Sequence, residues 1–507
     1  MTEAVARPGD PVTVRTSKGT VRGVARPGSI AFYGIPFAEP PAGPAAWESP
    51  RRRDAWAGVR DAQHPGPTPQ RRPFMDVTTV PEPSIPGDDT LSVNVFTPSP
   101  EISGTGLPVL VWFHGGGYIA GSPSSPWYDG SAFCRDGIVV VSASYRLGFV
   151  GFGDVEGAAP NRAVQDWIAA LEWVRDEIRA FGGDPARVTI AGQSAGGGAV
   201  TTLLGVPAAQ GLFHGAIAQS PAIGLIDEAT ARATSAKVAA ELGAPTTAEA
   251  LSLLDEDTVL DAQQAVLAAD STLDNQVRSA FSTARSAGTE FGPVRDGQLV
   301  RYDAEEAAER GIGTDKPLLI GATAHEFNMT AWGSAPRLAQ DGAVEFLTAH
   351  GIEPDAAVAY AEAQALQSAQ DALGQLTTDT TFRRRVDAFA RLPRTAGTWV
   401  YDFRWRSPTV GIAIHCIELP FVWDLMDAPT VPALVGEAPP RQLADRMHAA
   451  WVAFIRDGDP GWAAFTPTEP AGQVFDDEIR VVSDPFAAAR LIRPSTAGTT
   501  HATSPAA

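Results

Sequence analysis

The segment that most constrains this chain is RVTIAGQSAGGGAV at residues 187–200, which contains a G-x-S-x-G pattern centred on Ser194. A β-branched run before the pattern predicts a strand, and the small residues after it can begin a helix. Such a turn holds a serine in a strained conformation at the top of a sheet, with glycines where side chains would collide. The segment therefore predicts an α/β fold with a nucleophilic serine at 194. A glycine-rich loop with an ordinary serine is the alternative, because the pattern also arises by chance.

An alternation of strand-like and helix-like segments surrounds this turn. It predicts a central, mostly parallel, twisted sheet flanked by helices. Buried strands are expected at 107–113, 138–144, 187–192, 213–220, 317–323 and 398–405, and amphipathic helices at 163–182 and 444–458. The first hundred residues instead alternate short strand-like runs with proline-rich loops.

The domain organisation follows from the same alternation. We expect residues 1–493 to form a single α/β domain. Two helix-rich stretches, at about 226–290 and 333–395, are interpreted as insertions that form a helical cap over the sheet. Residues 494–507 are rich in Ala, Thr, Ser and Pro and are expected to form a disordered tail.

The composition narrows the range of partners. A net charge of −20 and a pI near 4.8 argue against nucleic acid or an anionic membrane. No apolar run reaches the length of a membrane-spanning helix, and the first residues lack the pattern of a secretory leader. Cys134 and Cys416 are predicted to be buried thiols, and no Cys–His spacing indicates zinc. We therefore expect a cytoplasmic monomer or weak homo-oligomer with no metal and no cofactor.

A glycine triplet follows the strand predicted at 107–113. The sequence FHGGGY at 113–118 matches the HGGG pattern of loops that stabilise an oxyanion. Glycines allow backbone N–H groups to approach a carbonyl oxygen on which negative charge develops. We assign the donors of this oxyanion hole to the N–H groups of Gly116, Gly117 and Ala195. The alternative is a tight glycine turn without a chemical role.

A triad built on such a serine needs an acid and then a base further along the chain. Glu326 comes just after a predicted strand, where active-site groups gather in α/β sheets, but Asp296 and Asp402 compete with it. Among the later histidines, His415 follows a strand and precedes an apolar loop. The others lie too early, within a helix, at a helix end or in the tail. By local sequence alone, His415 is as compatible with a core histidine as with a base.

From about residue 12 to 465, the chain resembles the type B carboxylesterases, the cholinesterase-like branch of the α/β-hydrolases. The elbow at 187–200 carries part of this resemblance. The other segments are FYGIPFAEPPAG (32–43), DDTLSVNVFTP (88–98), SYRLGFVGF (144–152), IGATAHEFNM (320–329), IAIHCIELPFVW (412–423) and AFIRDGDPGW (453–462). The resemblance implies that Glu326 is the acid and His415 the base.

The resemblance also implies an activity. A member of this family is expected to hydrolyse carboxylic esters of small molecules through a Ser-His-Glu triad and an acyl-enzyme. Short to medium acyl groups are expected, and the glycine triplet suggests room for a bulky alcohol. Hydrolysis of carbamates or other activated acyl groups by the same triad is one alternative. A non-catalytic, cholinesterase-like binding module is a more remote one.

Several positions depart from the family pattern or support its site. Gln193 stands where the family usually has Glu, and Ser220 matches a buried serine kept near the triad. We expect both to support the triad without reacting. Thr68 and Thr90 stand where the family has the cysteines of its first disulfide, which fits an unsecreted protein.

The residues expected to line the substrate pocket cluster around the catalytic turns and the cap. Each is alternatively an ordinary core residue. They are Tyr118, Ile223, Leu225, Phe327, Met329, Trp332, Leu419 and Phe421.

Overall fold

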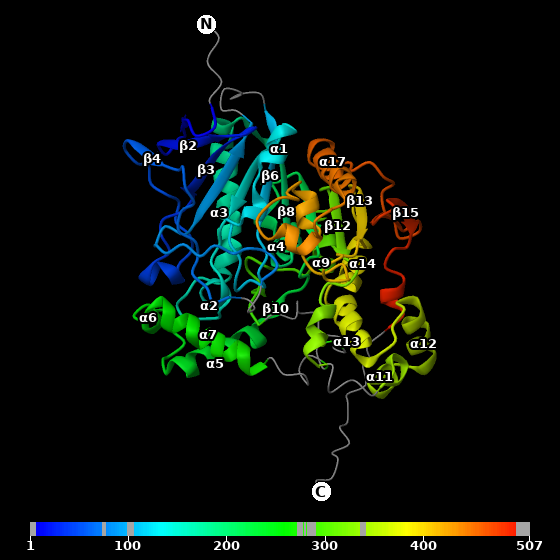
Figure 1. Cartoon of the computed structure of the whole chain (residues 1–507). Helices are drawn as coiled ribbons and strands as arrows, with labels where there is room; N and C mark the ends of the chain where they lie inside the picture. Colours follow the sequence, from blue (N-terminus) through cyan, green and yellow to red (C-terminus); the bar gives the residue numbers. More distant parts are fainter. Residues whose placement is uncertain are drawn as a thin grey trace.

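The computed structural model describes residues 7–73, 78–98, 106–270, 290–334 and 341–492, together with Val277 and Ala280. Within this part of the chain, a twisted sheet of 13 strands forms the centre of the molecule (Figure 1). Its order is β1 (Pro11–Arg15), β2 (Thr20–Arg26), β3 (Ser29–Pro36), β5 (Ser92–Thr97), β7 (Val139–Ala143), β6 (Leu107–Phe113), β8 (Gly183–Gln193), β9 (Gly215–Gln219), β12 (Leu318–Thr323), β13 (Thr398–Phe403), β14 (Ala471–Phe475) and β15 (Arg480–Ser483), with β4 (Val59–Asp61) on β2.

The central strands of this sheet are parallel. Every pair from β7 through β6, β8, β9, β12 and β13 to β14 is parallel, and the antiparallel pairs lie toward the two edges. The expected mostly parallel sheet is therefore confirmed. Because parallel strands share a direction, the carboxyl ends of β6, β8, β9 and β12 meet at one end of the sheet.

Strand β6 shows why its sequence is apolar throughout. Val109, Val111 and Phe113 face one hydrophobic core, whereas Leu110 and Trp112 face another on the opposite side of the sheet. Side chains alternate between the two faces of a strand, so a strand covered on both faces needs apolar residues at every position.

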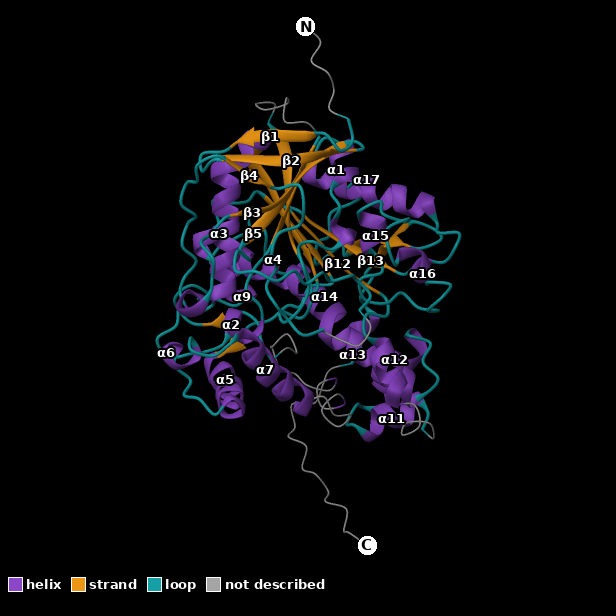
Figure 2. Ribbon diagram, turned by 60° about the vertical axis from the view of Figure 1, so that its left-hand side comes forward, coloured by secondary structure: helices purple, strands orange, loops and turns teal. Residues whose placement is uncertain are grey.

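Helices cover both faces of the sheet. α3 (Arg162–Glu177) and α4 (Ala195–Gly205) contribute to one core, and α1 (Ser131–Arg135), α15 (Leu419–Val422) and α17 (Arg441–Asp457) to the other. Figure 2 shows α3 and α17 on opposite sides of the sheet. The helix predicted at 163–182 is α-helical to Glu177 and continues as a 3-10 helix over Ile178–Phe181. Among the described residues, none of the helices has the length and apolar character needed to cross a bilayer.

Two further groups of helices lie beyond one end of the sheet (Figures 1 and 2). The first contains α5 (Glu228–Leu242), α6 (Ala248–Leu251) and α7 (Glu256–Asp270); the second contains α11 (Ala343–Ala349), α12 (Pro354–Ala363) and α13 (Ala369–Thr378). α13 leads into a π-helix (Asp379–Arg383) and α14 (Arg384–Ala390), which pack on β12. The shorter elements are α2 (Gly148–Phe152), α9 (Ala304–Glu309), α16 (Val431–Val435) and the parallel pair β10 (Ile226–Asp227) and β11 (Val294–Arg295).

Both helix groups fall within the stretches that the sequence predicted to be helical. The expected tail at 494–507 lies outside the described residues, as do most of 271–289 and all of 335–340.

Hydrogen bonds hold together the loop where the family has its first disulfide. The Thr68 N–H donates to the Ile85 carbonyl at 2.9 Å, and the Ile85 N–H donates to Thr68 Oγ1 at 2.9 Å. The carbonyl of Thr90 accepts a hydrogen bond from the hydroxyl of Ser144. Thr68 is thus held by Ile85, and Thr90 by Ser144.

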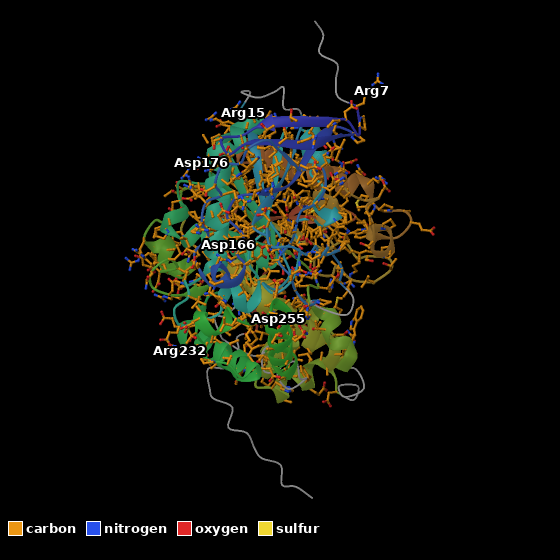
Figure 3. The ribbon with its side chains drawn as sticks, turned by 90° about the vertical axis from the view of Figure 1, so that its left-hand side faces the viewer. Arg7, Arg15, Asp166, Asp176, Arg232 and Asp255 are labelled. Atoms are coloured by element: carbon orange, nitrogen blue, oxygen red, sulfur yellow. The ribbon has the colours of Figure 1, made fainter. Side chains whose placement is uncertain are left out.

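A buried ion pair joins α3 to the segment after β7. The Arg146 guanidinium donates to both carboxylate oxygens of Asp166, at 2.9 and 2.6 Å, and both side chains are almost inaccessible to solvent. Asp176, on the same helix, instead lies at the margin of the molecule (Figure 3) and pairs with the exposed Arg52 and Arg175. Asp166 and Asp176 therefore provide a buried and a more exposed carboxylate on the same helix.

We expect Asp166→Asn to lower the free energy of unfolding by about 3–5 kcal/mol, because it leaves the buried charge of Arg146 unpaired. Asp176→Asn is the matched control and should cost no more than about 1 kcal/mol, since exposed ion pairs contribute little. Urea unfolding at pH 7 measures both values. Equal losses in the two variants would contradict the assigned role of the buried pair.

Candidate active site

Ser194 occupies a sharp turn between β8 and α4. Its φ of 58° and ψ of −121° are strained for a residue with a side chain. The Ser194 N–H donates to the Gln219 carbonyl at 3.0 Å, and the Ser194 carbonyl accepts from the Ala222 N–H at 3.0 Å. These bonds to the end of β9 and the loop that follows hold the turn in place.

Glycines flank Ser194 because two backbones touch there. A Cβ on Gly196 would lie 1.9 Å from the carbonyl oxygen of Phe113, at the end of β6. A Cβ on Gly192 would lie 2.3 Å from the backbone of Gly196. No side chain fits at either position, which explains the G-x-S-x-G spacing in terms of packing.

The glycine triplet after β6 lies beside this turn. A Cβ on Gly115 would come within 3.2 Å of the Cβ of Ser194. Gly116 and Gly117 have φ values of 118° and 60° and are half-buried. Among the described residues, neither of their N–H groups has an acceptor. Ala195 begins α4, so its N–H is one of the first-turn donors that lack an intrahelical partner.

A buried histidine supports the glycine loop. The ring of His114 stacks on Tyr145 with centroids 4.4 Å apart, and its Nδ1 lies 2.8 Å from the Gly115 carbonyl. Burial lowers the pKa of His114 to about 4, so the ring is neutral near pH 7 and its Nδ1–H donates to this carbonyl. The Tyr145 hydroxyl donates to the His114 carbonyl at 2.8 Å. Both contacts hold the first turn of the loop.

Glu326 and His415 meet at the same end of the sheet. Glu326 lies three residues after β12 and is fully buried. One of its oxygens accepts from the Thr323 N–H at 2.7 Å, and the other contacts Nδ1 of His415 in a short hydrogen bond. His415 is half-buried on the segment after β13, and its N–H donates to the Glu326 carbonyl at 3.0 Å. His415 is therefore a carboxylate-bound histidine and not an isolated core residue.

Aromatic rings enclose the imidazole of His415. The ring of Phe327 lies edge-on at a centroid distance of 4.9 Å, and the ring of Phe382 lies at 4.8 Å. Phe382 belongs to the π-helix, a form that often occurs at functional sites. The next residue, Arg383, donates to the Thr323 carbonyl at 3.0 Å. One turn of π-helix thus contacts both the histidine and the turn that carries Glu326.

The two other candidate acids have different partners. Asp402 is fully buried and forms ion pairs with Arg383 and Arg404, which lower its pKa against the opposing effect of burial. Asp296 accepts hydrogen bonds from Asn161 and from the backbone of the turn at 298–300. Neither carboxylate contacts His415 in the described part of the chain.

A second buried carboxyl lies near Glu326. Glu418 is fully buried, and burial, followed by the negative charge of Glu326, raises its pKa to about 8. Glu418 Oε1 accepts from Gln219 Nε2 at 3.3 Å, and Gln219 Oε1 accepts from Trp451 Nε1 at 3.1 Å. Glu418 is therefore a neutral acid near pH 7 within a buried hydrogen-bonded chain.

The two residues predicted to support the triad both lie in this region. Ser220 is fully buried, has a φ of 40°, and donates its N–H to the Gly321 carbonyl at 2.8 Å. Its hydroxyl has no hydrogen-bond partner among the described residues. Gln193 is also buried, and its Nε2 lies 3.2 Å from Nε2 of His415.

Five of the eight predicted pocket residues are at least partly accessible. Ile223 and Leu225 are half-buried and line a cavity of about 830 Å³ beside α4. Phe327 lies against His415, as described above. Met329 packs beside one hydrophobic core, and Trp332 is 47% exposed.

The other three pocket expectations need correction, because these side chains are buried in the core. Tyr118 is fully buried and packs on Phe152 and Trp167. Leu419 and Phe421 are fully buried on the side of the sheet covered by α17. Phe421 packs on Phe403 and Trp405, and both Leu419 and Phe421 belong to this core and not to a pocket wall.

Sequence reasoning did not select several residues that the structure brings to the site. These are His114, Tyr145, Phe382, Arg383, Cys416 and Glu418. His114 belongs to the HGGG pattern, and Glu418 belongs to the segment that carries His415. Both could therefore have been selected from the sequence as residues near the site. Cys416 lies in the same segment as Glu418, and Tyr145 lies in the segment at 144–152. Phe382 and Arg383 instead contact the site from a distant part of the chain and have no local pattern.

Comparison with known proteins agrees with this geometry. The carboxylesterase family matches residues 10–473. The chain is 32% identical to the para-nitrobenzyl esterase of Bacillus subtilis (strain 168) over 93% of this chain and 96% of that protein. It is 33% identical to the phenmedipham hydrolase of Pseudarthrobacter oxydans over 91% and 94% of the respective chains. A solved carboxylesterase of Geobacillus stearothermophilus aligns with a TM-score of 0.81 and 32% identity, covering 94% of this chain and 99% of that one.

A parallel sheet that presents a strained serine after its central strand is the α/β-hydrolase fold, as the sequence predicted. Since the matches span most of the chain, this protein belongs to the carboxylesterase family and is a carboxylic ester hydrolase.

The raised pKa of Glu418 predicts a pH-dependent stability. Between pH 4.5, its ordinary pKa, and about 8, the folded protein retains a proton that the unfolded chain has lost. This group therefore makes the wild type less stable as pH rises through that window, by at most about 1.4 kcal/mol per pH unit. Glu418→Gln has no such proton. Its free energy of unfolding relative to wild type should rise from pH 5 to pH 8, as measured by urea unfolding.

The control is Glu249→Gln, at an exposed position on α6, which should follow the wild type at both pH values. A constant difference between Glu418→Gln and wild type across this range would contradict the prediction.

Proposed function

We propose that the protein hydrolyses carboxylic esters with Ser194 as nucleophile, His415 as general base and Glu326 as the acid that orients the histidine. The observation that carries the proposal is the hydrogen bond between Glu326 and His415. It lies at the same end of the sheet as the strained turn of Ser194. A carboxylate on Nδ1 fixes the tautomer that leaves Nε2 free to accept a proton. The order of serine, acid and base along the chain is the one typical of α/β-hydrolases and supports the same assignment.

The proposed reaction proceeds through an acyl-enzyme. Ser194 Oγ forms a bond to the ester carbonyl carbon while its proton passes to Nε2 of His415, and the carbonyl oxygen becomes an oxyanion. The N–H groups of Gly116, Gly117 and Ala195 stabilise that oxyanion. When the intermediate collapses, the C–O bond breaks and the leaving alkoxide takes the proton from the imidazolium. Water then repeats the sequence on the acyl-enzyme and releases the carboxylic acid.

Ser194→Ala should lower kcat for a p-nitrophenyl ester by about 10⁴-fold or more, because it removes the nucleophile. A fluorophosphonate probe should label the wild type at Ser194 and fail to label the variant. Ser252→Ala, at the end of α6, is the control and should retain both activity and labelling. Near-normal turnover by Ser194→Ala would refute the assignment.

We propose that the cavity beside α4 receives short to medium acyl chains. Ile223 and Leu225, in the loop after β9, line it together with Thr202 of α4. The loop that carries Ile223 is anchored to the turn of the proposed nucleophile, since the Ser194 carbonyl accepts from the N–H of Ala222, the residue before Ile223. The other apolar side chains of its lining, which include Val300, Phe389 and Leu392, suit a hydrocarbon chain.

Ile223→Trp should narrow this cavity and reduce kcat/KM for a p-nitrophenyl octanoate by about 10-fold or more, while the acetate ester stays within about 3-fold of wild type. The control is Leu253→Trp at a highly exposed position, which should leave the chain-length preference unchanged. An equal reduction for both esters would argue against an acyl role for the cavity.

A second candidate activity is hydrolysis of carbamates or other activated acyl groups by the same triad. The 33% identity to a phenmedipham hydrolase favours testing it. Values of kcat/KM for phenmedipham and aryl carbamates should be measured beside matched aryl esters and one tertiary-alcohol ester. A preference for carbamates would replace esters as the proposed natural class, whereas absence of Ser194 labelling would favour a non-catalytic binding module.

We also propose that residues 1–493 form one domain, with the helices of 226–290 and 333–395 as its cap. The position of α5–α7 and α11–α13 beyond one end of the sheet supports this organisation. We propose a cytoplasmic protein that acts as a monomer or weak homo-oligomer on a small-molecule ester. Thr68 and Thr90 in place of disulfide cysteines support a reducing compartment.

A further inference from the structure

The side chain of Gln193 connects two neighbouring residues of the segment that carries the proposed base. Gln193 ends β8 directly before Ser194, and its side chain is buried. Its Nε2 lies 3.2 Å from His415 Nε2, and its Oε1 accepts from the Sγ of Cys416 at 3.3 Å. A single amide therefore contacts both the imidazole and the thiol that follows it in the chain.

The backbone of Cys416 has an unusual conformation. Its φ of 71° lies in the left-handed region, which disfavours residues with side chains. With this backbone, both the ring of His415 and the thiol of Cys416 reach Gln193. Burial raises the pKa of the Cys416 thiol well above its usual range, so Sγ keeps its hydrogen and acts as a donor.

The amide orientation is complementary to a neutral imidazole. Because Nδ1 of His415 is bound to the carboxylate of Glu326, the neutral ring carries its hydrogen on Nδ1 and accepts at Nε2. The NH₂ group of Gln193 is the matching donor. If the amide were reversed, its oxygen would face the lone pair on Nε2 of the neutral ring, which is unfavourable. The same oxygen would accept a hydrogen bond from Nε2 of the protonated ring.

We propose that Cys416 is a positioning residue for the hydrolytic reaction: its thiol holds Gln193 Oε1, and thereby keeps the amide NH₂ facing Nε2 of His415. This inference rests on the proposed role of His415 as the base. The NH₂ group holds the resting imidazole in its neutral form, ready to accept the proton of Ser194. At 3.2 Å this contact is at the long end of hydrogen bonding, so the serine hydroxyl can replace it at low cost.

The same orientation matters after proton transfer. The protonated Nε2 of His415 cannot donate to the NH₂ group of Gln193, so its hydrogen stays available to the leaving alkoxide. A reversed amide would instead accept that hydrogen and hold it away from the leaving group. Loss of the Cys416 thiol should therefore move the acidic limb of the pH–rate profile to higher pH and lower kcat.

The charged groups around His415 come from several elements. Glu326 contacts the ring, and Arg383 of the π-helix and Glu418 lie near Glu326. Glu82 lies near Cys416, and the other faces of the ring contact Phe327 and Phe382. None of these groups changes in the variants below, so differences in pH dependence report on the amide and the thiol.

The test compares the pH dependence of kcat and kcat/KM for wild type, Cys416→Ala and Cys416→Ser between pH 4.5 and 8.5, with a short-chain p-nitrophenyl ester. Cys416→Ala removes the donor but keeps a Cβ. We expect its acidic limb to move up by about 0.5 pH unit and its kcat to fall by about 3- to 10-fold. Cys416→Ser retains a donor and should stay within about 2-fold of wild type, with an unshifted limb. Cys134→Ala is the matched cysteine control and should superimpose on wild type.

A double-mutant cycle separates positioning from general packing. Gln193→Met removes the amide while keeping a side chain of similar length. In that background, Cys416→Ala should produce no further shift of the acidic limb, because the thiol acts only through the amide. An equal shift in both backgrounds would show that Cys416 acts on His415 without Gln193, and would overturn the inference.

Two other results are decisive. If Cys416→Ala is folded by urea unfolding and has the wild-type pH profile, the inference is wrong while the proposed function stands. If the wild type neither hydrolyses esters nor reacts with a fluorophosphonate at Ser194, the proposed function itself fails. If Cys416→Ala does not fold, the Gln193→Met variant still tests the inference. Gln193→Met alone should also move the acidic limb of the pH–rate profile. An unmoved limb in that variant would overturn the inference.

Discussion

The site depends on a place where two backbones touch. The end of β6 meets the turn between β8 and α4 so closely that a Cβ on Gly196 would lie 1.9 Å from the Phe113 carbonyl oxygen. This contact places the glycine loop after β6 beside Ser194, where a Cβ on Gly115 would lie 3.2 Å from the Cβ of Ser194. Since backbone atoms create the constraint, no rearrangement of side chains could relieve it. The close-packed sheet and its two hydrophobic cores hold these backbones in position.

A second constraint acts on the acid and base. Glu326 has one oxygen on the backbone of its own turn and the other on His415, so the carboxylate is held from both sides. The π-helix that follows α13 contributes Phe382 against the imidazole and Arg383 against the Thr323 carbonyl. The π-helix thus contacts both the proposed base and the turn that carries the proposed acid. This arrangement links the proposed cap to the orientation of the proposed base.

Much of the fold could be predicted because it depends on local pattern. The apolar run of β6 predicted a strand covered on both faces, and the amphipathic pattern at 163–182 predicted the helix that ends near Glu177. The pocket was predicted less well. Leu419 and Phe421 follow His415 closely in sequence, yet helix α15 directs them into the opposite core. Adjacency in sequence does not define the direction of a side chain, which depends on the turn that intervenes.

The sequence by itself determined the strained serine turn and the glycine triplet, because each needs particular residues at particular local positions. The local sequence did not decide whether His415 is a base or a core residue, and only family resemblance favoured the base. Only the tertiary structure decided that His415 contacts Glu326, that Asp402 is instead paired with Arg383, and that Gln193 is held by Cys416. These contacts join strand ends far apart in the chain. They depend on the assembly of the whole sheet, which no local pattern encodes.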